Sequence, residues 1–223
     1  MTWKQFFTSS IGKKFVMGFT GFFLILYLVI HAGVNALIFY NDGGRIFNTA
    51  AHFLSHNIIM RILEVGLFAG FALHIAQGFL LWKQNSASRP IRYKMNRSDS
   101  KSRWYSRSMG LLGTLLLLFL VMHLYHFWWG TKTALYFQND APINLYGEMK
   151  EVFSNPVVIF LYMLGLVSLL FHLLHGFQSA FQTFGIHHKR YTPLLRAMGV
   201  IYSVGICILF AFMPMSVYLK WLQ

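Results

Sequence analysis

The sequence predicts an all-α integral membrane protein, a bundle of five transmembrane helices. Of its 223 residues, 56% are hydrophobic and only 11% are charged, a balance typical of membrane proteins and not of soluble domains. Five apolar segments are each long enough to cross a hydrocarbon core about 30 Å thick, which takes about 20 residues. Both observations indicate that most of the chain lies within the membrane.

We expect these helices in a single membrane domain covering residues 1–223, at residues 15–39, 58–82, 108–130, 157–184 and 197–219. The first segment is interpreted as a retained helix and not a signal peptide, because it is long enough to span and lacks a short apolar core before a small-residue cleavage site. The single cysteine, Cys207, excludes an internal disulfide, a cysteine-rich metal site and a CxxCH haem attachment.

The distribution of positive charge predicts the orientation of the helices. Of the 19 Lys and Arg residues, fourteen fall on the side of the N-terminus and five on the other side. The positive-inside rule therefore puts the N-terminus in the cytoplasm and the C-terminus outside. Topology alone accounts for the basic stretch 83–107; a docking surface for a soluble partner or anionic lipid head groups would be an additional role. Nucleic acid binding is not expected.

Four of the predicted helices carry a histidine inside an apolar run: His31, His74, His123 and His175. An unpaired imidazole in hydrocarbon costs several kcal/mol, so each of these rings needs a partner. One such histidine in each of four helices predicts two non-covalent b-type haems, each held by two axial histidines. An iron with two axial imidazoles has no open position, so it passes electrons and does not bind oxygen.

Depth in the membrane sorts these histidines into two pairs. Counted from the cytoplasmic end of each predicted helix, His31 lies about 25 Å deep and His123 about 23 Å deep. On the same count His74 and His175 lie about 14 and 15 Å deep. Each level thus holds one histidine from each of two helices, and two haems at these levels would make an electron path across the bilayer.

Two of these helices carry a second histidine that is also a candidate haem ligand. His126 lies three residues from His123, and His172 lies three residues from His175, each on nearly the same helix face. Physical reasoning from the sequence does not choose within either set, although the depth match favours His175 over His172. The remaining histidine of each set is expected to be a hydrogen-bonded interior or interfacial residue. The alternative is that the remaining histidine interacts with a quinone or a haem propionate.

At these residues the chain resembles a known family, the five-helix di-haem cytochrome b subunits of succinate:quinone oxidoreductases (succinate dehydrogenase and quinol:fumarate reductase). The matching segments are HAGVN at His31, LHIAQGFLLW at His74, MHLYHFWW at His123 and LHGFQSAF at His175. The resemblance covers nearly the whole chain. It implies His74 and His175 as ligands of the inner haem and His31 and His123 as ligands of the outer haem, which agrees with the depth pairing.

The resemblance also implies partners and a location. A flavoprotein subunit would interconvert succinate and fumarate, and an iron–sulfur subunit would exchange electrons with the inner haem. Menaquinone is the implied quinone and the bacterial cytoplasmic membrane the implied location. The chain would then be a non-flavin subunit of the enzyme without a succinate site of its own. Some fumarate reductases carry a glutamate two residues before the HG histidine; Leu173 stands there, so a proton path of that type is not expected.

Glu64 is an acidic residue inside a predicted helix, ten residues before His74. An intramembrane carboxylate is a candidate functional group. It could accept a proton released by quinol oxidation. Alternatively, it is an interfacial glutamate paired with Arg61, three residues away on the same face.

Two other functions fit parts of the pattern. The first is a di-haem cytochrome b of another membrane oxidoreductase, of the hydrogenase or formate dehydrogenase type, which co-purifying chains would distinguish. The second is a small transporter or channel whose histidines relay protons. Such a protein would be colourless. Its function would also not explain why the histidines form two pairs that are matched in depth.

Overall fold

The computed structural model describes residues 9–87, 104–137, 144–186 and 188–222, and all regular structure in these ranges is helical. The five spanning segments are α2 (Ser10–Asn35) with the short 3-10 helix η1 (Ala36–Tyr40), α4 (Ile58–Ala87), the composite helix α6 (Met109–His123), η2 (Leu124–Trp129) and α7 (Gly130–Phe137), α9 (Pro156–Thr183) and α10 (Thr192–Tyr218). Three shorter helices connect them: α3 (Arg45–His56), α5 (Trp104–Arg107) and α8 (Leu145–Val152).

The predicted five-helix membrane architecture is confirmed. Each of the five segments is long and apolar enough to cross a membrane, so the chain is a multi-pass membrane protein. Some helix ends differ from those expected, because polar residues at the membrane interface can continue a helix beyond its apolar segment. α4 runs to Ala87, five residues beyond the expected end at 82. The orientation relative to the cytoplasm stays a prediction, and residues 88–103 of the basic stretch lie outside the described residues.

Local signals set the starts of two helices. The side chain of Ser9 accepts a hydrogen bond from the Gly12 amide at the start of α2, which satisfies one of the free N–H groups of the first turn. Asn155 accepts one from the Val157 amide in the same way, and Pro156 occupies the first position of α9, where its missing N–H costs nothing.

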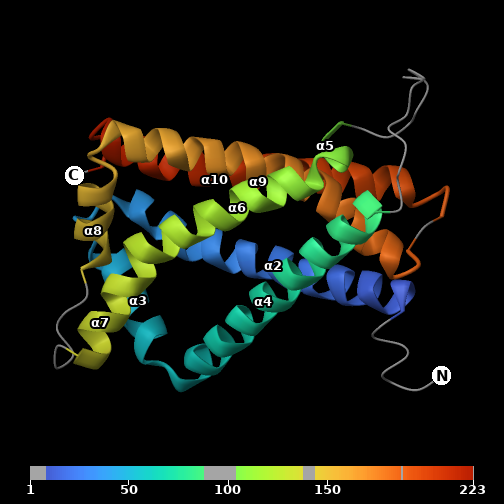
Figure 1. Ribbon diagram of the computed structural model, residues 1–223. Coiled ribbons are helices and arrows are strands. Elements are labelled where there is room, and N and C mark those ends of the chain that lie inside the picture. The colour runs from blue at the N-terminus through green and yellow to red at the C-terminus, as the bar shows by residue number, and fades with distance from the viewer. Residues whose placement is uncertain (1–8, 88–103, 138–143, 187, 223) are drawn as a thin grey trace.

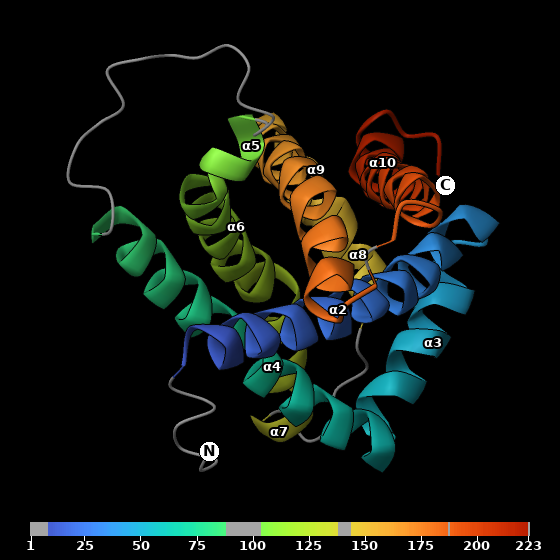
Figure 2. The same cartoon turned by 90° about the vertical axis from the view of Figure 1, so that its right-hand side faces the viewer.

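Four helices form a ring, and the fifth covers one side of it. α2 packs against α4 and α9, and α6 packs against α9 and α4. α10 lies against α9 and α2, outside the ring, as Figure 2 shows. The two diagonals of the ring, α2 to α6 and α4 to α9, have no comparable helix packing in the described residues. The contents of the space between these four helices therefore depend on the side chains that extend across the two diagonals.

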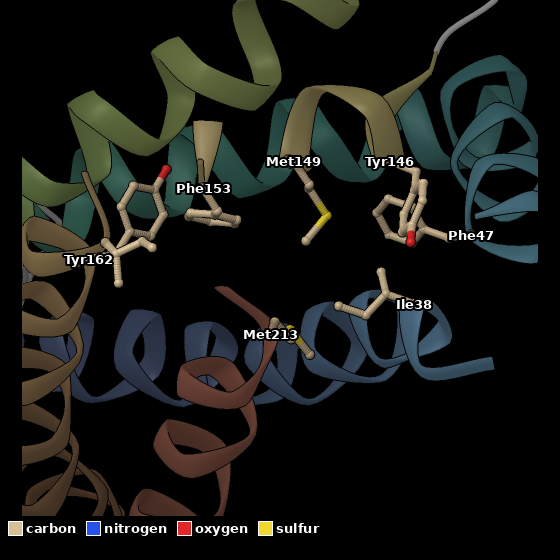
Figure 3. Packing of buried hydrophobic residues seen from close by; sticks show 8 residues of the cluster. Ile38, Phe47, Tyr146, Met149, Phe153, Tyr162 and Met213 are labelled. Atoms are coloured by element: carbon tan, nitrogen blue, oxygen red, sulfur yellow. The ribbon is translucent and has the colours of Figure 1, made fainter. Parts of the chain in front are cut away.

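Short helices close one end of the bundle. α3, α7 and α8 gather at the end where α10 finishes, whereas α5 lies at the opposite end (Figure 1). A buried cluster ties α3 and α8 to the spanning helices through Ile38, Phe47, Tyr146, Met149 and Met213 (Figure 3). We call this closed end the outer cap, since the sequence predicts that it faces away from the cytoplasm.

Gly165 provides a test of this packing, because α9 approaches α6 closely there. A Cβ on Gly165 would lie 2.4 Å from Cδ2 of Phe119, whose ring is stacked on His123 with centres 5.7 Å apart. Overpacking of this kind costs about 1–3 kcal/mol. We expect Gly165→Ala to lower the apparent Tm in detergent. Gly66→Ala is the matched control, since nothing lies within 4 Å of its Cβ position; equal Tm values for the two variants would contradict this packing.

Candidate functional site

The first pair of histidines joins α2 to α6 across one diagonal of the ring. The rings of His31 and His123 have centres 5.7 Å apart with their planes at 85°. His123 is the last residue of α6, directly before the π-helical turn η2; π turns inside α-helices occur often at functional sites. The structure thus brings together the two histidines that the sequence paired at the outer level.

The second pair joins α4 to α9 across the other diagonal, and its member on α9 is His172. The rings of His74 and His172 have centres 6.1 Å apart with their planes at 60°. Within the described residues, no ring contact connects His74 to His175. The structure therefore brings His172, and not the expected His175, into ring contact with His74, and the identity of the ligand on α9 stays a prediction.

His172 and His175 lie about 60° apart around α9 and about 4.5 Å apart along it. The rotation of α9 against α4 therefore determines which of the two rings contacts His74.

The spacing of both pairs fits one metal between two imidazoles. A metal–imidazole bond is about 2 Å long and the nitrogen lies about 1 Å from the ring centre, so two opposed rings have centres about 6 Å apart. All four rings are half-buried and not sealed in the core. Among the described residues, no group of three or more His, Cys, Asp or Glu could hold a metal ion.

Three glycines of the spanning helices differ in their surroundings. Neither Gly113 on α6 nor Gly176 on α9 has any atom within 4 Å of where a Cβ would stand, although both residues are half-buried. Gly70 differs, because a Cβ there would meet the Phe23 ring at 3.1 Å, so this glycine serves helix packing.

The second ring nitrogens have unequal surroundings. His74 Nδ1 lies 3.1 Å from the Thr20 hydroxyl oxygen, and His31 Nδ1 lies 3.4 Å from the hydroxyl of Tyr27. In contrast, Nδ1 of His123 and Nδ1 of His172 are buried and have no hydrogen-bond partner in the described structure. A metal-bound histidine usually donates its other N–H to an oxygen, which fixes its tautomer.

His126, the second candidate on α6, has a different partner. Its Nδ1 lies 3.0 Å from the hydroxyl of Tyr162, and the two rings are stacked with centres 5.9 Å apart. Tyr162 is buried. This is the hydrogen-bonded interior role that the sequence analysis expected for the remaining histidine of the set.

Glu64 has two partners, and both come from the composite third span. Its Oε1 accepts a hydrogen bond from Trp128 Nε1 at 2.5 Å, and its Oε2 lies 2.7 Å from Lys132 Nζ. The alternative pairing with Arg61 is wrong: Arg61 Nε donates to the Ser55 carbonyl at 3.4 Å. Tertiary packing prevails over the local spacing because α7 brings an ammonium group directly to the carboxylate.

A cavity of about 460 Å³ opens beside this carboxylate. Its lining includes Glu64, Val65, Phe68, Trp128, Lys132 and Tyr136. Most of these side chains are apolar or aromatic, and the polar groups converge at Glu64. Apolar pockets with a few convergent polar groups are typical ligand sites.

The comparison with curated proteins fits this geometry. The chain is 26% identical over 201 residues to the succinate dehydrogenase cytochrome b558 subunit of Bacillus subtilis (strain 168), covering 86% of this chain and 89% of the relative. The expected resemblance is confirmed. This homologue and the five apolar helices support a membrane-bound cytochrome b of a respiratory chain. No family model matches the chain, and no solved structure matches it.

Glu148 on α8 adds a titratable group to the outer cap. Burial raises the pKa of its carboxyl, and the nearby charge of Glu151 raises that pKa further. Its Oε2 is buried without a hydrogen-bond partner in the described structure. Because the folded state holds this proton more tightly than the unfolded state, stability should fall as the pH rises above the ordinary carboxyl pKa.

We therefore expect Glu148→Gln to be more stable than the wild type near neutral pH, with the difference vanishing at acidic pH. Thermal unfolding in detergent across this pH range measures the effect. Parallel stability curves for the two proteins would show that Glu148 does not titrate differently on folding.

Proposed function

We propose that this chain is the membrane anchor and di-haem cytochrome b subunit of a succinate:quinone oxidoreductase. The observation that carries the proposal is the pair of histidine contacts at 5.7 and 6.1 Å across the two diagonals of one four-helix ring. A proton-relaying transporter has no need of two opposed imidazole pairs. The similarity to a succinate dehydrogenase cytochrome b558 subunit supports this choice among di-haem cytochromes.

His31 and His123 would hold the outer haem b, and His74 and His172 would hold the inner one. The haems would supply one-electron chemistry at these two places. The residues around them hold the rings in place: Phe119 stacks on His123 and Phe210 packs on His31 with ring centres 5.6 Å apart. These apolar neighbours exclude water and so keep the surroundings of the site at low dielectric.

The proposed role is electron transfer between an iron–sulfur subunit on the cytoplasmic side and quinone in the membrane. A flavoprotein subunit of the same complex would carry the succinate site, because this chain has no FAD motif. The first turns of α2 and the connection between α9 and α10 lie at the end of the bundle opposite the outer cap (Figure 1). These segments carry Lys13, Lys14, Lys189 and Arg190. Together with the basic stretch 83–107 they would dock the soluble subunits.

The cavity beside Glu64 is the proposed site for the ring of menaquinone. It lies at the outer level, since Trp128 follows the outer histidine His123 by five residues on the same span. The contacts from Trp128 and Lys132 hold the Glu64 carboxylate at the edge of the cavity. A carboxylate placed there can accept a proton from quinol as its electrons leave.

The first test is a reduced-minus-oxidised absorption spectrum of the purified chain, with haem quantified per polypeptide. We expect two low-spin b haems. His172→Ala should remove the inner haem and His175→Ala should keep it, because the ring contact of His74 across the diagonal is with His172. His52→Ala, on the exposed face of α3, is the matched control. Loss of a haem in His175→Ala with retention in His172→Ala would return the ligand to His175; no haem in folded wild type would overturn the proposed function.

A second experiment addresses Glu64. Glu64→Gln should reduce quinone turnover by about tenfold or more, because the amide cannot accept the proton, and both haem spectra should stay unchanged. Glu151→Gln, at an exposed position of α8, serves as the control. Wild-type turnover in Glu64→Gln would eliminate the role as proton acceptor.

A further inference from the structure

Thr20 is a buried polar residue in the part of α2 that faces the inner histidine pair. Only 5% of it is exposed. Its hydroxyl oxygen lies 2.8 Å from the Val16 carbonyl oxygen on its own helix and 3.1 Å from His74 Nδ1 on α4. One threonine hydroxyl therefore connects the α2 backbone to a proposed haem ligand.

The direction of these two hydrogen bonds follows from the number of protons. A hydroxyl has one proton to donate and two lone pairs to accept with. The shortest contact of the hydroxyl, at 2.8 Å, is to the Val16 carbonyl, which can only accept, so we assign the threonine proton to that bond. With the proton there, the contact with His74 runs from Nδ1–H to the threonine oxygen. This places the ring proton of His74 on Nδ1 and leaves Nε2 with its lone pair free.

The residue after Thr20 also lies beside the imidazole. Gly21 follows Thr20 on α2, and a Cβ there would stand 3.4 Å from Cε1 and 3.9 Å from Nδ1 of His74, in ordinary van der Waals contact. The His74 ring thus lies against this part of α2. The same nitrogen of its proposed fellow ligand, His172, has no partner in the described structure.

We propose that Thr20 is a positioning residue for His74: its hydroxyl oxygen fixes the Nδ1–H tautomer and the ring orientation in which Nε2 faces His172. This inference rests on the proposed function. An acceptor on Nδ1–H makes the imidazole a more basic ligand. A more basic ligand stabilises the ferric state over the ferrous state and holds the midpoint potential of the inner haem down.

The test uses the full chain with its haems and two substitutions at one position. Thr20→Val removes the acceptor at nearly constant volume, and Thr20→Ser keeps it. Thr114→Val is the matched control, because Thr114 makes the same bond to a carbonyl four residues earlier on its own helix, to Gly110 at 2.9 Å. Redox titration of the two haems and the rate of haem loss to an acceptor protein are the readouts.

We expect Thr20→Val to shift the inner haem to a more positive midpoint potential and to weaken its retention by about 10- to 100-fold, with the outer haem unchanged. Thr20→Ser and Thr114→Val should match the wild type. Gly21→Ala is a further control, since its methyl group would stand in ordinary van der Waals contact with the His74 ring, 3.4 Å from Cε1, and should leave both potentials close to those of the wild type.

An unchanged inner potential in Thr20→Val would overturn the role of Thr20 while leaving the di-haem proposal in place. If the wild-type chain bound no haem at all, the proposed function itself would fail. Equal shifts of both haems in Thr20→Val would also count against the inference, because they would indicate a general loosening of the bundle.

Discussion

The cost of placing an imidazole in hydrocarbon is the constraint on which this structure depends. A histidine in the middle of a membrane must find a partner, because lipid offers no hydrogen bonds. Here the rings meet in two pairs, and each pair spans a diagonal of the ring of α2, α4, α6 and α9. These helices pack on their neighbours along the sides of the ring, so the two diagonals are free to hold side chains and a cofactor.

The remaining elements of the fold support these two diagonals. α10 covers α9 and α2 from outside, and the Tyr202 hydroxyl on α10 donates to the Ile25 carbonyl of α2 at 2.7 Å. At the outer cap, the packing of α3 against α8 closes the end of the bundle above His31 and His123. The covering helices thus hold in position the four spans that carry the histidines.

Polar side chains inside the bundle have few hydrogen-bonding groups within reach, and this determines their contacts. Thr20 uses its one proton on its own helix and its free lone pair on His74, and Glu64 divides its two oxygens between an indole and an ammonium group. In water such groups would exchange partners freely. In a membrane interior each contact is nearly irreplaceable, so it fixes the rotamer and, for histidine, the tautomer.

The sequence by itself determined the class of protein, the number of spans and the two levels of histidines, because hydropathy and helical rise are properties of a single helix. It also placed His31 opposite His123. Tertiary structure decided the rest. His172 and His175 differ by about 60° around α9 and about 4.5 Å along it, so the rotation of α9 against α4 determines which of them contacts His74. Likewise, Arg61 is near Glu64 in sequence, but Lys132, 68 residues away, is near it in space, and only the packing of α7 beside α4 decides between the two.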